Sequence, residues 1–174
     1  EIDRTAGTHP VRQALDNLEN AGTVYGAIIY QKAPIVMRQL ERLLGEAAFQ
    51  AGMREYLKRH AFANASWPDL IALLDAATPR DLAAWSRAWV EEAGRPVVTT
   101  ALELDTEGRV RTLALEQADP HGRGRVWPQA LEVTLGGPDG ERRIGVALDT
   151  ARVEVREAVG GPAPRYVLPT GGGL

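Results

Sequence analysis

The chain has 174 residues, a formal net charge of −3 and no cysteine. A chain of this length can form one large domain or two small ones. The acidic balance argues against a duplex nucleic acid partner, because phosphates are usually held by a surplus of Lys and Arg. The absence of cysteine excludes disulfides and thiolate chemistry and is typical of a reducing compartment. No apolar run approaches the ~18 residues that span a bilayer. We therefore expect a soluble, cytoplasmic protein without a membrane partner.

The two halves of the sequence differ in composition and in periodicity. Six of the 18 glycines precede Pro96 and twelve follow it. Residues 1–95 contain capped segments of helical period, whereas residues 96–174 contain short alternating runs separated by Gly, Pro and Asp. The predicted fold class is therefore α+β with two domains: an α-helical bundle over residues 1–95 and a small antiparallel β-sandwich over residues 96–174.

Five helices are predicted in the first half. The first is expected from Thr8 to near Gly22, and the next two over residues 28–45 and 46–60. The fourth begins at Ser66, with Asp69 completing a capping box, and the fifth is expected to begin at Thr78 and Pro79. Residues with helical spacing are expected to be buried, namely Ile35 or Val36, Leu40, Leu43 and Leu44, then Phe49, Met53, Tyr56, Leu57 and His60, then Leu82, Trp85 and Trp89.

About six short strands are predicted in the second half. Residues 97–104 and 109–117 flank DTEG, which is typical of a hairpin turn. Residues 131–135 and 144–148 alternate on either side of the turn GGPDGE, and residues 153–155 and the segment RYVLP continue the pattern. This spacing predicts an antiparallel arrangement.

Neither a metal site nor a nucleophile can be recognised. The three histidines, His9, His60 and His121, show no pair at ligand spacing, and no HExxH motif is present. There is no GxSxG motif, and the two serines, Ser66 and Ser86, lie at a predicted helix cap and within a predicted helix. These residues are interpreted as structural or exposed.

Tyr30 and Lys32 are polar residues inside the apolar run that leads into the second helix. Because they are two positions apart, they point in different directions on a helix and cannot form a Tyr-x-x-x-Lys pair. A tyrosine phenol with an ordinary pKa near ~10 stays protonated and can donate a hydrogen bond to an oxygen that becomes negative during a reaction. From the residues alone, two interpretations of Tyr30 remain open: a half-buried core tyrosine, and an oxyanion donor held by a packed helix.

The order of short motifs narrows this choice. The chain contains His9-Pro10, then YQKAP, LGEAAF, YLKRH and Asn64-Ala65, then WVEEAGRP and RYVLPTGGG. This series resembles the aminopeptidase N family of zinc metallopeptidases, downstream of its zinc-binding helices. The resemblance covers nearly the whole chain. It implies that residues 1–95 are the C-terminal part of a thermolysin-like catalytic domain and that residues 96–174 are the β-sandwich domain that follows.

The resemblance also implies a role for Tyr30. It aligns with the family's catalytic tyrosine, which donates a hydrogen bond to the oxyanion formed when zinc-bound water attacks the scissile peptide. Lys32 is then expected to be a scaffold or surface residue whose ammonium stays in water. Two departures are Lys32-Ala33-Pro34 in place of the family's Lys-Gly-Ala, and Thr170 in place of the usual asparagine.

The HExxH motif and the Gly-x-Met-Glu-Asn motif of this family are both missing. We therefore expect a fragment whose zinc motif lies upstream of Glu1. Zinc and a peptide substrate are then expected for the full-length parent, while this chain alone binds no metal and is inactive. The alternative is a non-catalytic helical plus β-sandwich module for protein interaction. A carbohydrate-binding sandwich finds little support, because only Trp127 and Tyr166 are aromatic in the second half.

Overall fold

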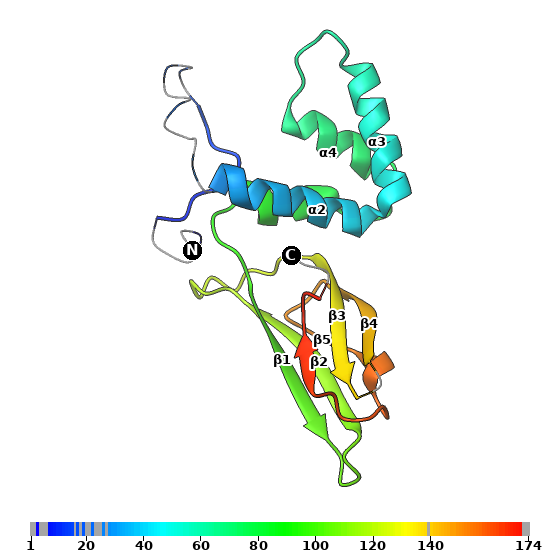
Figure 1. Ribbon diagram of the computed structural model, residues 1–174. Coiled ribbons are helices and arrows are strands. Elements are labelled where there is room, and N and C mark those ends of the chain that lie inside the picture. Colours follow the sequence, from blue (N-terminus) through cyan, green and yellow to red (C-terminus); the bar gives the residue numbers. More distant parts are fainter. Residues whose placement is uncertain are drawn as a thin grey trace. The chain divides into compact units, whose positions relative to one another are not determined.

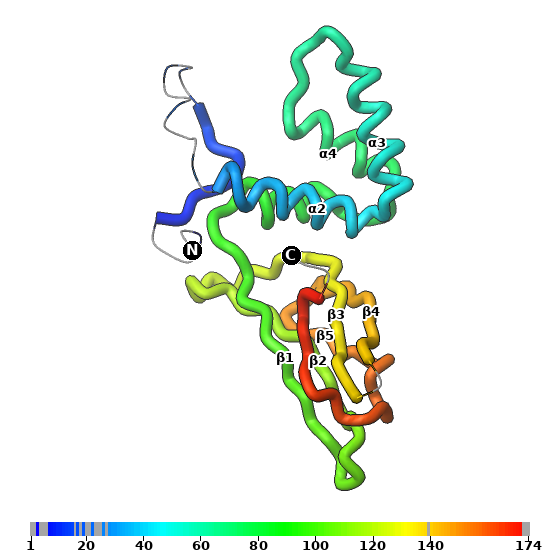
Figure 2. The backbone as a smooth tube through the Cα atoms, in the orientation of Figure 1, coloured from blue at the N-terminus to red at the C-terminus, as the bar shows by residue number. Residues whose placement is uncertain are grey.

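A computed structural model of the chain describes residues 3, 7–15, 17, 19, 22, 26, 28–138 and 140–171. The chain folds into two compact units, Glu1–Gly94 and Arg95–Leu174. The described helices of four or more residues lie in the first unit and the strands lie in the second (Figure 1). The fold class is α+β, and the path of the backbone can be followed from blue to red in Figure 2.

Helices follow one another closely in the first unit. A π-helix, η3, precedes α2, and a second π-helix, η4, follows α5. Their bounds are η3 Ile28–Lys32, α2 Ala33–Leu44, α3 Glu46–Arg59, α4 Trp67–Asp75, α5 Leu82–Ser86 and η4 Arg87–Glu91.

Over residues 8–15 the predicted first helix is not observed, since these residues carry no helical assignment. The Thr8 hydroxyl, which was expected near the helix start, donates instead to the Asp3 carboxylate over 2.6 Å. The backbone N–H of Arg12 donates to the carbonyl of Val90 over 2.9 Å. Tertiary contacts thus use the groups that a first helical turn would need, and most of residues 16–22 lie outside the described residues.

Helix α2 follows the predicted pattern. Val36, Leu40 and Leu43 are buried, while Ile35 lies on the exposed side. Gly45 ends the helix at a φ of +83°, and its N–H donates to the Glu41 carbonyl over 2.8 Å. A residue without a Cβ adopts this backbone conformation without strain, so the predicted glycine cap is confirmed.

Helix α3 does not bury the stripe that its spacing predicts. Phe49, Met53 and Tyr56 are half-buried, Leu57 is 65% exposed, and Gly52 is the buried residue of the helix. The side chain of Leu74 on α4 occupies the space where a Cβ of Gly52 would lie. Helix α4 therefore approaches α3 most closely at the glycine, which leaves the larger side chains beside it only partly covered.

Ser66 and Asp69 cap α4 as predicted, whereas α5 is capped by a different residue from the predicted Thr78. The N–H and the hydroxyl of Ser66 donate to the Asp69 carboxylate over 2.8 and 2.5 Å. Both bonds lower the pKa of Asp69, and the bond from the hydroxyl has the larger effect. Helix α5 begins at Leu82, and Asp81 caps it by accepting the N–H of Ala84 over 2.7 Å. Thr78 lies too far before this first turn to cap it.

The core of the helical unit gathers side chains from several helices. Leu40, Leu74, Leu82 and Trp85 are at most 1% exposed, and Trp89 is also buried. The two tryptophans are four residues apart, as expected for one buried face. Their predicted packing role is confirmed.

In the described part of the second unit, six strands form two antiparallel three-stranded sheets, with strand orders β1-β2-β5 and β4-β3-β6 (Figure 1). Their bounds are β1 Val97–Leu104, β2 Val110–Ala118, β3 Gln129–Gly137, β4 Gly140–Leu148, β5 Arg152–Glu154 and β6 Tyr166–Leu168. The strands agree with the predicted runs to within a few residues.

The turn chemistry of the β1–β2 hairpin is local. Asp105 accepts the N–H groups of Glu107 and Arg109 over 2.9 and 2.8 Å. Gly108 has a φ of +73°, which favours glycine at this position. The predicted DTEG hairpin is confirmed, and the predicted GGPDGE turn lies between β3 and β4, with residue 139 outside the described part.

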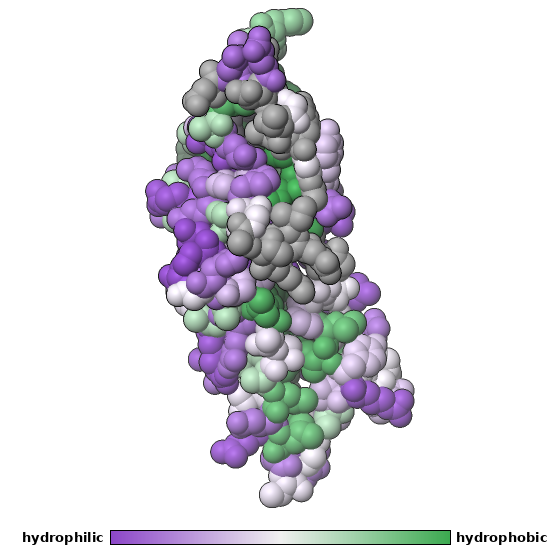
Figure 3. Space-filling view, turned by 90° about the vertical axis from the view of Figure 1, so that its left-hand side faces the viewer, coloured by the Kyte–Doolittle hydropathy of each residue, from purple (hydrophilic) through white to green (hydrophobic). Residues whose placement is uncertain are grey.

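Both sheets contribute to one hydrophobic core. Its buried members are Val110, Leu113, Leu115, Leu131, Val133, Ile144, Val146, Leu148, Val155 and Ala158. Hydrophobic side chains also reach the surface over the strands, in the lower part of Figure 3. The large hydrophobic residues of this unit that are exposed are Val97, Leu102, Leu104, Val159, Tyr166 and Leu168.

Candidate functional site

Tyr30 lies in the middle of the π-helix η3, between two buried residues. Ile28 is 3% exposed and Lys32 is 8% exposed, whereas Tyr30 is 67% exposed. A half-buried core tyrosine is therefore the wrong interpretation. Most of the surface of Tyr30 is exposed, while the residues at both ends of the π-helix that carries it are buried.

Pro34 explains why a π-helix forms at this point. It is the second residue of α2. In a regular α-helix its ring would clash with the carbonyl of Tyr30, four residues earlier, and it has no N–H to pair with that carbonyl. A wider turn with i→i+5 pairing relieves the clash, and single π turns of this kind recur at functional sites. Pro34 thus shapes the turn that presents Tyr30.

Lys32 is buried, and the expectation that its ammonium stays in water is wrong. Its Nζ atom lies 3.0 Å from an Asp3 carboxylate oxygen and donates to the carbonyl of Gly94 over 2.6 Å. The side chains of Lys32 and Asp3 are 9% and 11% exposed. A buried charge needs a partner, and here a carboxylate and a carbonyl provide it. The other oxygen of Asp3 accepts the Thr8 hydroxyl.

Asp3 and Gly94 were not singled out by sequence reasoning. Gly94 is 62 residues from Lys32 along the chain. No local pattern indicates contacts over such a distance. The sequence showed only that Lys32 lies within an apolar run. Such a position indicates that the ammonium has a buried partner, but it does not indicate which residue that partner is.

The histidines are not brought together. The Nδ1 atom of His9 lies within hydrogen-bonding distance of the side-chain nitrogen of Gln13, at 2.9 Å. The ring of His60 lies beside that of Tyr56, with ring centroids 5.0 Å apart. His121 lies in the loop after β2, in the other unit. Among the described residues, no group of three or more His, Cys, Asp or Glu side chains is arranged to hold a metal ion. This part of the chain therefore does not fit a zinc ion.

Ser86 has a structural role in the helical unit. Its hydroxyl accepts the indole N–H of Trp67 over 2.8 Å and donates to Glu91 over 3.1 Å. The serine is therefore engaged with two neighbours and has no histidine beside it in these contacts. Ser66 is engaged in the cap described above. Both serines agree with their predicted structural roles.

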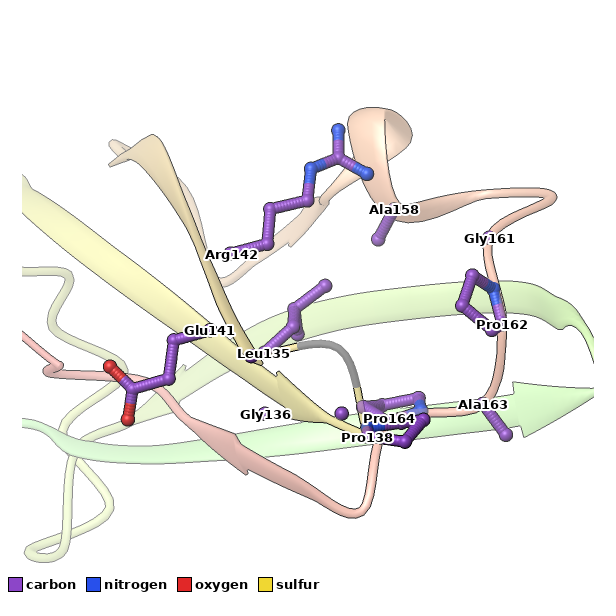
Figure 4. Close-up of a pocket in the computed structure, with 12 residues that line it drawn as sticks. Leu135, Gly136, Pro138, Glu141, Arg142, Ala158, Gly161, Pro162, Ala163 and Pro164 are labelled. Atoms are coloured by element: carbon purple, nitrogen blue, oxygen red, sulfur yellow. The ribbon is translucent and has the colours of Figure 1, made fainter.

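Two surface hollows lie on the described part of the chain. One, of about 200 Å³, lies beside the β3–β4 turn and is lined largely by Leu135, Ala158, glycines and prolines (Figure 4). The Glu141 carboxylate points away from the space between Leu135 and Pro162 (Figure 4). The other, of about 310 Å³, is lined by Arg59, His60, Asp69, Ala72, Leu73 and Ala76. Tyr30 lines neither of these two hollows.

The described helices are short or polar along at least part of their length. None of the helices in the described part of the chain combines the length and the apolar character that crossing a membrane would require.

Comparison with known proteins identifies the family. A model of the peptidase family M1 domain matches residues 1–89. Aminopeptidase N of Streptomyces lividans is 36% identical over 178 residues, which cover 95% of this chain and 21% of that protein. The puromycin-sensitive aminopeptidase of Caenorhabditis elegans is 28% identical over 139 residues, which cover 78% of this chain and 15% of that protein. The chain thus spans about a fifth or less of the length of these relatives.

A solved structure supports the fold. The structure of Legionella pneumophila aminopeptidase A in complex with aspartic acid matches 76% of this chain with a TM-score of 0.62 and 20% sequence identity, over 15% of that chain. The order of motifs, the matching family model and the similar relatives agree with one another. The chain belongs to peptidase family M1.

Proposed function

We propose that this chain is part of a longer zinc aminopeptidase that removes N-terminal residues from peptides. Two observations support this: family membership, and a length of about one fifth of the aminopeptidase from Streptomyces lividans. In this proposal, residues 1–95 are the C-terminal part of a thermolysin-like catalytic domain, and residues 96–174 are the β-sandwich domain that follows. The division into compact units after Gly94 supports this boundary.

Tyr30 is the catalytic residue that this chain contributes. Its phenol donates a hydrogen bond to the oxygen that becomes negative when the scissile peptide carbonyl turns tetrahedral. The observation that carries the proposal is its position: the side chain is 67% exposed in the middle of a π-helix whose two ends are buried. A donor held in this way stabilises the developing charge without reorganising during the reaction.

Family membership implies zinc in the full-length protein. Because the described residues hold no group of suitable ligands, the zinc ligands and the general base belong to other parts of the parent protein. The contribution of this chain to the reaction is the hydrogen bond from Tyr30. The isolated chain is therefore expected neither to bind zinc stoichiometrically nor to hydrolyse aminoacyl amides.

Replacement of Tyr30 in the full-length enzyme tests the proposal. Tyr30→Phe removes the hydroxyl and keeps the ring, so kcat is expected to fall by about 10²–10³, the usual effect of losing one oxyanion donor. Tyr56→Phe is the matched control, because that hydroxyl donates to the Ser66 carbonyl over 3.3 Å and has no proposed catalytic role. A Tyr30→Phe enzyme with full turnover, zinc content and stability would refute the assignment.

A further inference from the structure

Tyr30 and Lys32 are on opposite sides of one short turn. Two positions along an α-helix correspond to a rotation of about 200°, and the wider turn of a π-helix keeps two such residues on roughly opposite sides. The exposures agree, with Tyr30 at 67% and Lys32 at 8%. Whatever fixes the direction of Lys32 therefore also fixes the direction of Tyr30.

Lys32 is held by directional contacts. Its ammonium is 3.0 Å from Asp3 and 2.6 Å from the Gly94 carbonyl, and Asp3 is in turn hydrogen-bonded to Thr8 at 2.6 Å. These partners come from the start of the helical unit and from its last residue. The ammonium thus joins η3 to two remote segments of the same unit.

The π-helix needs such an anchor. Its hydrogen-bond ladder is interrupted at Pro34, which has no N–H, and π turns are stable only as short pieces. Burial of Ile28 contributes an apolar contact, but the hydrophobic effect is not directional and does not by itself set the rotation of the turn. The hydrogen bond from Lys32 to the Gly94 carbonyl does so, because a hydrogen bond weakens steeply when its angle is distorted.

We propose that Lys32 is the positioning residue of Tyr30: its buried ammonium, held by Asp3 and the Gly94 carbonyl, fixes the rotation of the π-helix so that the phenol faces the reacting carbonyl. This proposal rests on the catalytic role proposed for Tyr30. Lys32 itself touches neither substrate nor metal. Its effect on the reaction passes entirely through the position of the tyrosine hydroxyl.

The test uses the full-length enzyme and two variants. Lys32→Met removes the charge and keeps an unbranched side chain of similar reach. The double variant Lys32→Met with Asp3→Asn also neutralises the partner, so that no unpaired charge remains buried and folding is protected. We expect each to lower kcat by about 10- to 100-fold, since a displacement of about 1 Å has effects of this size. KM is expected to change by less than about twofold. Lys58→Met, an exposed position on α3, is the matched control.

A double-mutant cycle separates positioning from a general structural role. In the Tyr30→Phe background, Lys32→Met is expected to change kcat by less than about twofold, because the hydroxyl that Lys32 positions is already absent. Equal losses in the presence and absence of the hydroxyl would overturn the proposal, as would full turnover of a folded Lys32→Met or double variant. Zinc content and the thermal midpoint are measured for every variant.

Binding of a phosphinic peptide, which presents a tetrahedral oxyanion, provides a readout besides turnover. Lys32→Met should weaken it by the same factor as kcat/KM, and leave the binding of a free amino acid product unchanged. Equal weakening of both ligands would contradict positioning. The outcomes also separate the two proposals: no effect of Tyr30→Phe rejects the catalytic role itself, whereas a loss with Tyr30→Phe and none with either Lys32 variant rejects only the positioning role.

Discussion

The hydroxyl of Tyr166 on β6 donates a hydrogen bond to Glu141 on β4 over 2.7 Å, across the strand β3 that separates them. Gly136 on β3 is paired with both residues, so the three form one row. The Tyr166 ring occupies the space that a Cβ of Gly136 would need. The bond to the Glu141 carboxylate raises the pKa of Tyr166, because it favours the protonated phenol.

Gly136→Ala is expected to destabilise the second unit. The added methyl group would overlap the Tyr166 ring and displace it from Glu141. Overpacking of this kind costs about 1–3 kcal/mol. Urea unfolding, followed through the amide signals of the second unit, measures the loss.

Gly145→Ala on β4 is the control for this change. No atom lies within 4 Å of the position that its Cβ would take. Its free energy of unfolding is expected to change by less than about 0.5 kcal/mol. Equal stability of the two variants would show that the Tyr166 ring does not depend on Gly136.

The lowered pKa of Asp119 leads us to expect that the second unit loses stability in acid. Hydrogen bonds from the Arg123 guanidinium, at 2.9 and 3.1 Å, are the main cause that lowers the pKa of Asp119 to about 2, and the His121 N–H contributes as well. The ordinary pKa of an aspartate carboxyl is 3.8. A carboxyl with a depressed pKa in the folded state stabilises that state above its unfolded pKa, and the contribution disappears as pH falls through the folded value.

The stability difference between the native chain and Asp119→Asn is therefore expected to be constant above about pH 5 and to shrink between about pH 4 and pH 2. Urea unfolding at a series of pH values measures it. A difference that does not depend on pH in this window would show that Asp119 titrates normally. Arg123→Gln should move the pKa of Asp119 upward, which NMR titration of the carboxyl can detect.

The cap of α5 gives a prediction with a built-in comparison. Asp81 accepts the N–H of Ala84 at 2.7 Å, whereas Thr78 accepts the N–H of Arg80 at 3.4 Å, before the helix begins. Asp81→Ala is expected to lower the free energy of unfolding by about 0.5–2 kcal/mol. Thr78→Ala is expected to cost less than about 0.5 kcal/mol. A larger loss of stability for Thr78→Ala than for Asp81→Ala would instead show that Thr78 caps the helix, as the sequence predicted.

The Trp67–Ser86 bond joins α4 to α5 within the helical core. Ser86→Ala leaves the indole N–H without this acceptor and is expected to cost about 1–3 kcal/mol. The indole N–H signal in the NMR spectrum should shift at the same time. In a Trp67→Phe background the same substitution should cost clearly less, because no donor is left unpaired. An equal cost in both backgrounds would assign the effect to Ser86 packing alone.

Much of the fold could be predicted from local patterns. The strand runs, the DTEG turn, the Ser66–Asp69 capping box and the Gly45 cap depend on residues close together in the chain, so their signals are visible in the sequence. The errors arose where distant groups compete. The expected helix after Thr8 is absent from residues 8–15, because Thr8 and Arg12 bond to Asp3 and Val90 instead.

The candidate site was predicted only in part. Family motifs pointed to Tyr30, and its chemistry follows from the phenol. Neither the π-helix nor the burial of Lys32 was predicted. Pro34 could have indicated the π-helix, because it has no N–H and its ring does not fit inside a regular α-helix. No sequence pattern indicated the partners of Lys32, because Asp3 and Gly94 lie at the two ends of the helical unit.

The sequence by itself determined the α-then-β order, the strand runs, the Gly45 and Ser66–Asp69 caps and the family, because each depends on side-chain types at short and regular spacing. Only the tertiary structure decided which way Tyr30 and Lys32 face. That choice depends on an ammonium finding a carboxylate and a carbonyl from remote segments, and an ion is buried only where the folded chain brings such partners to it.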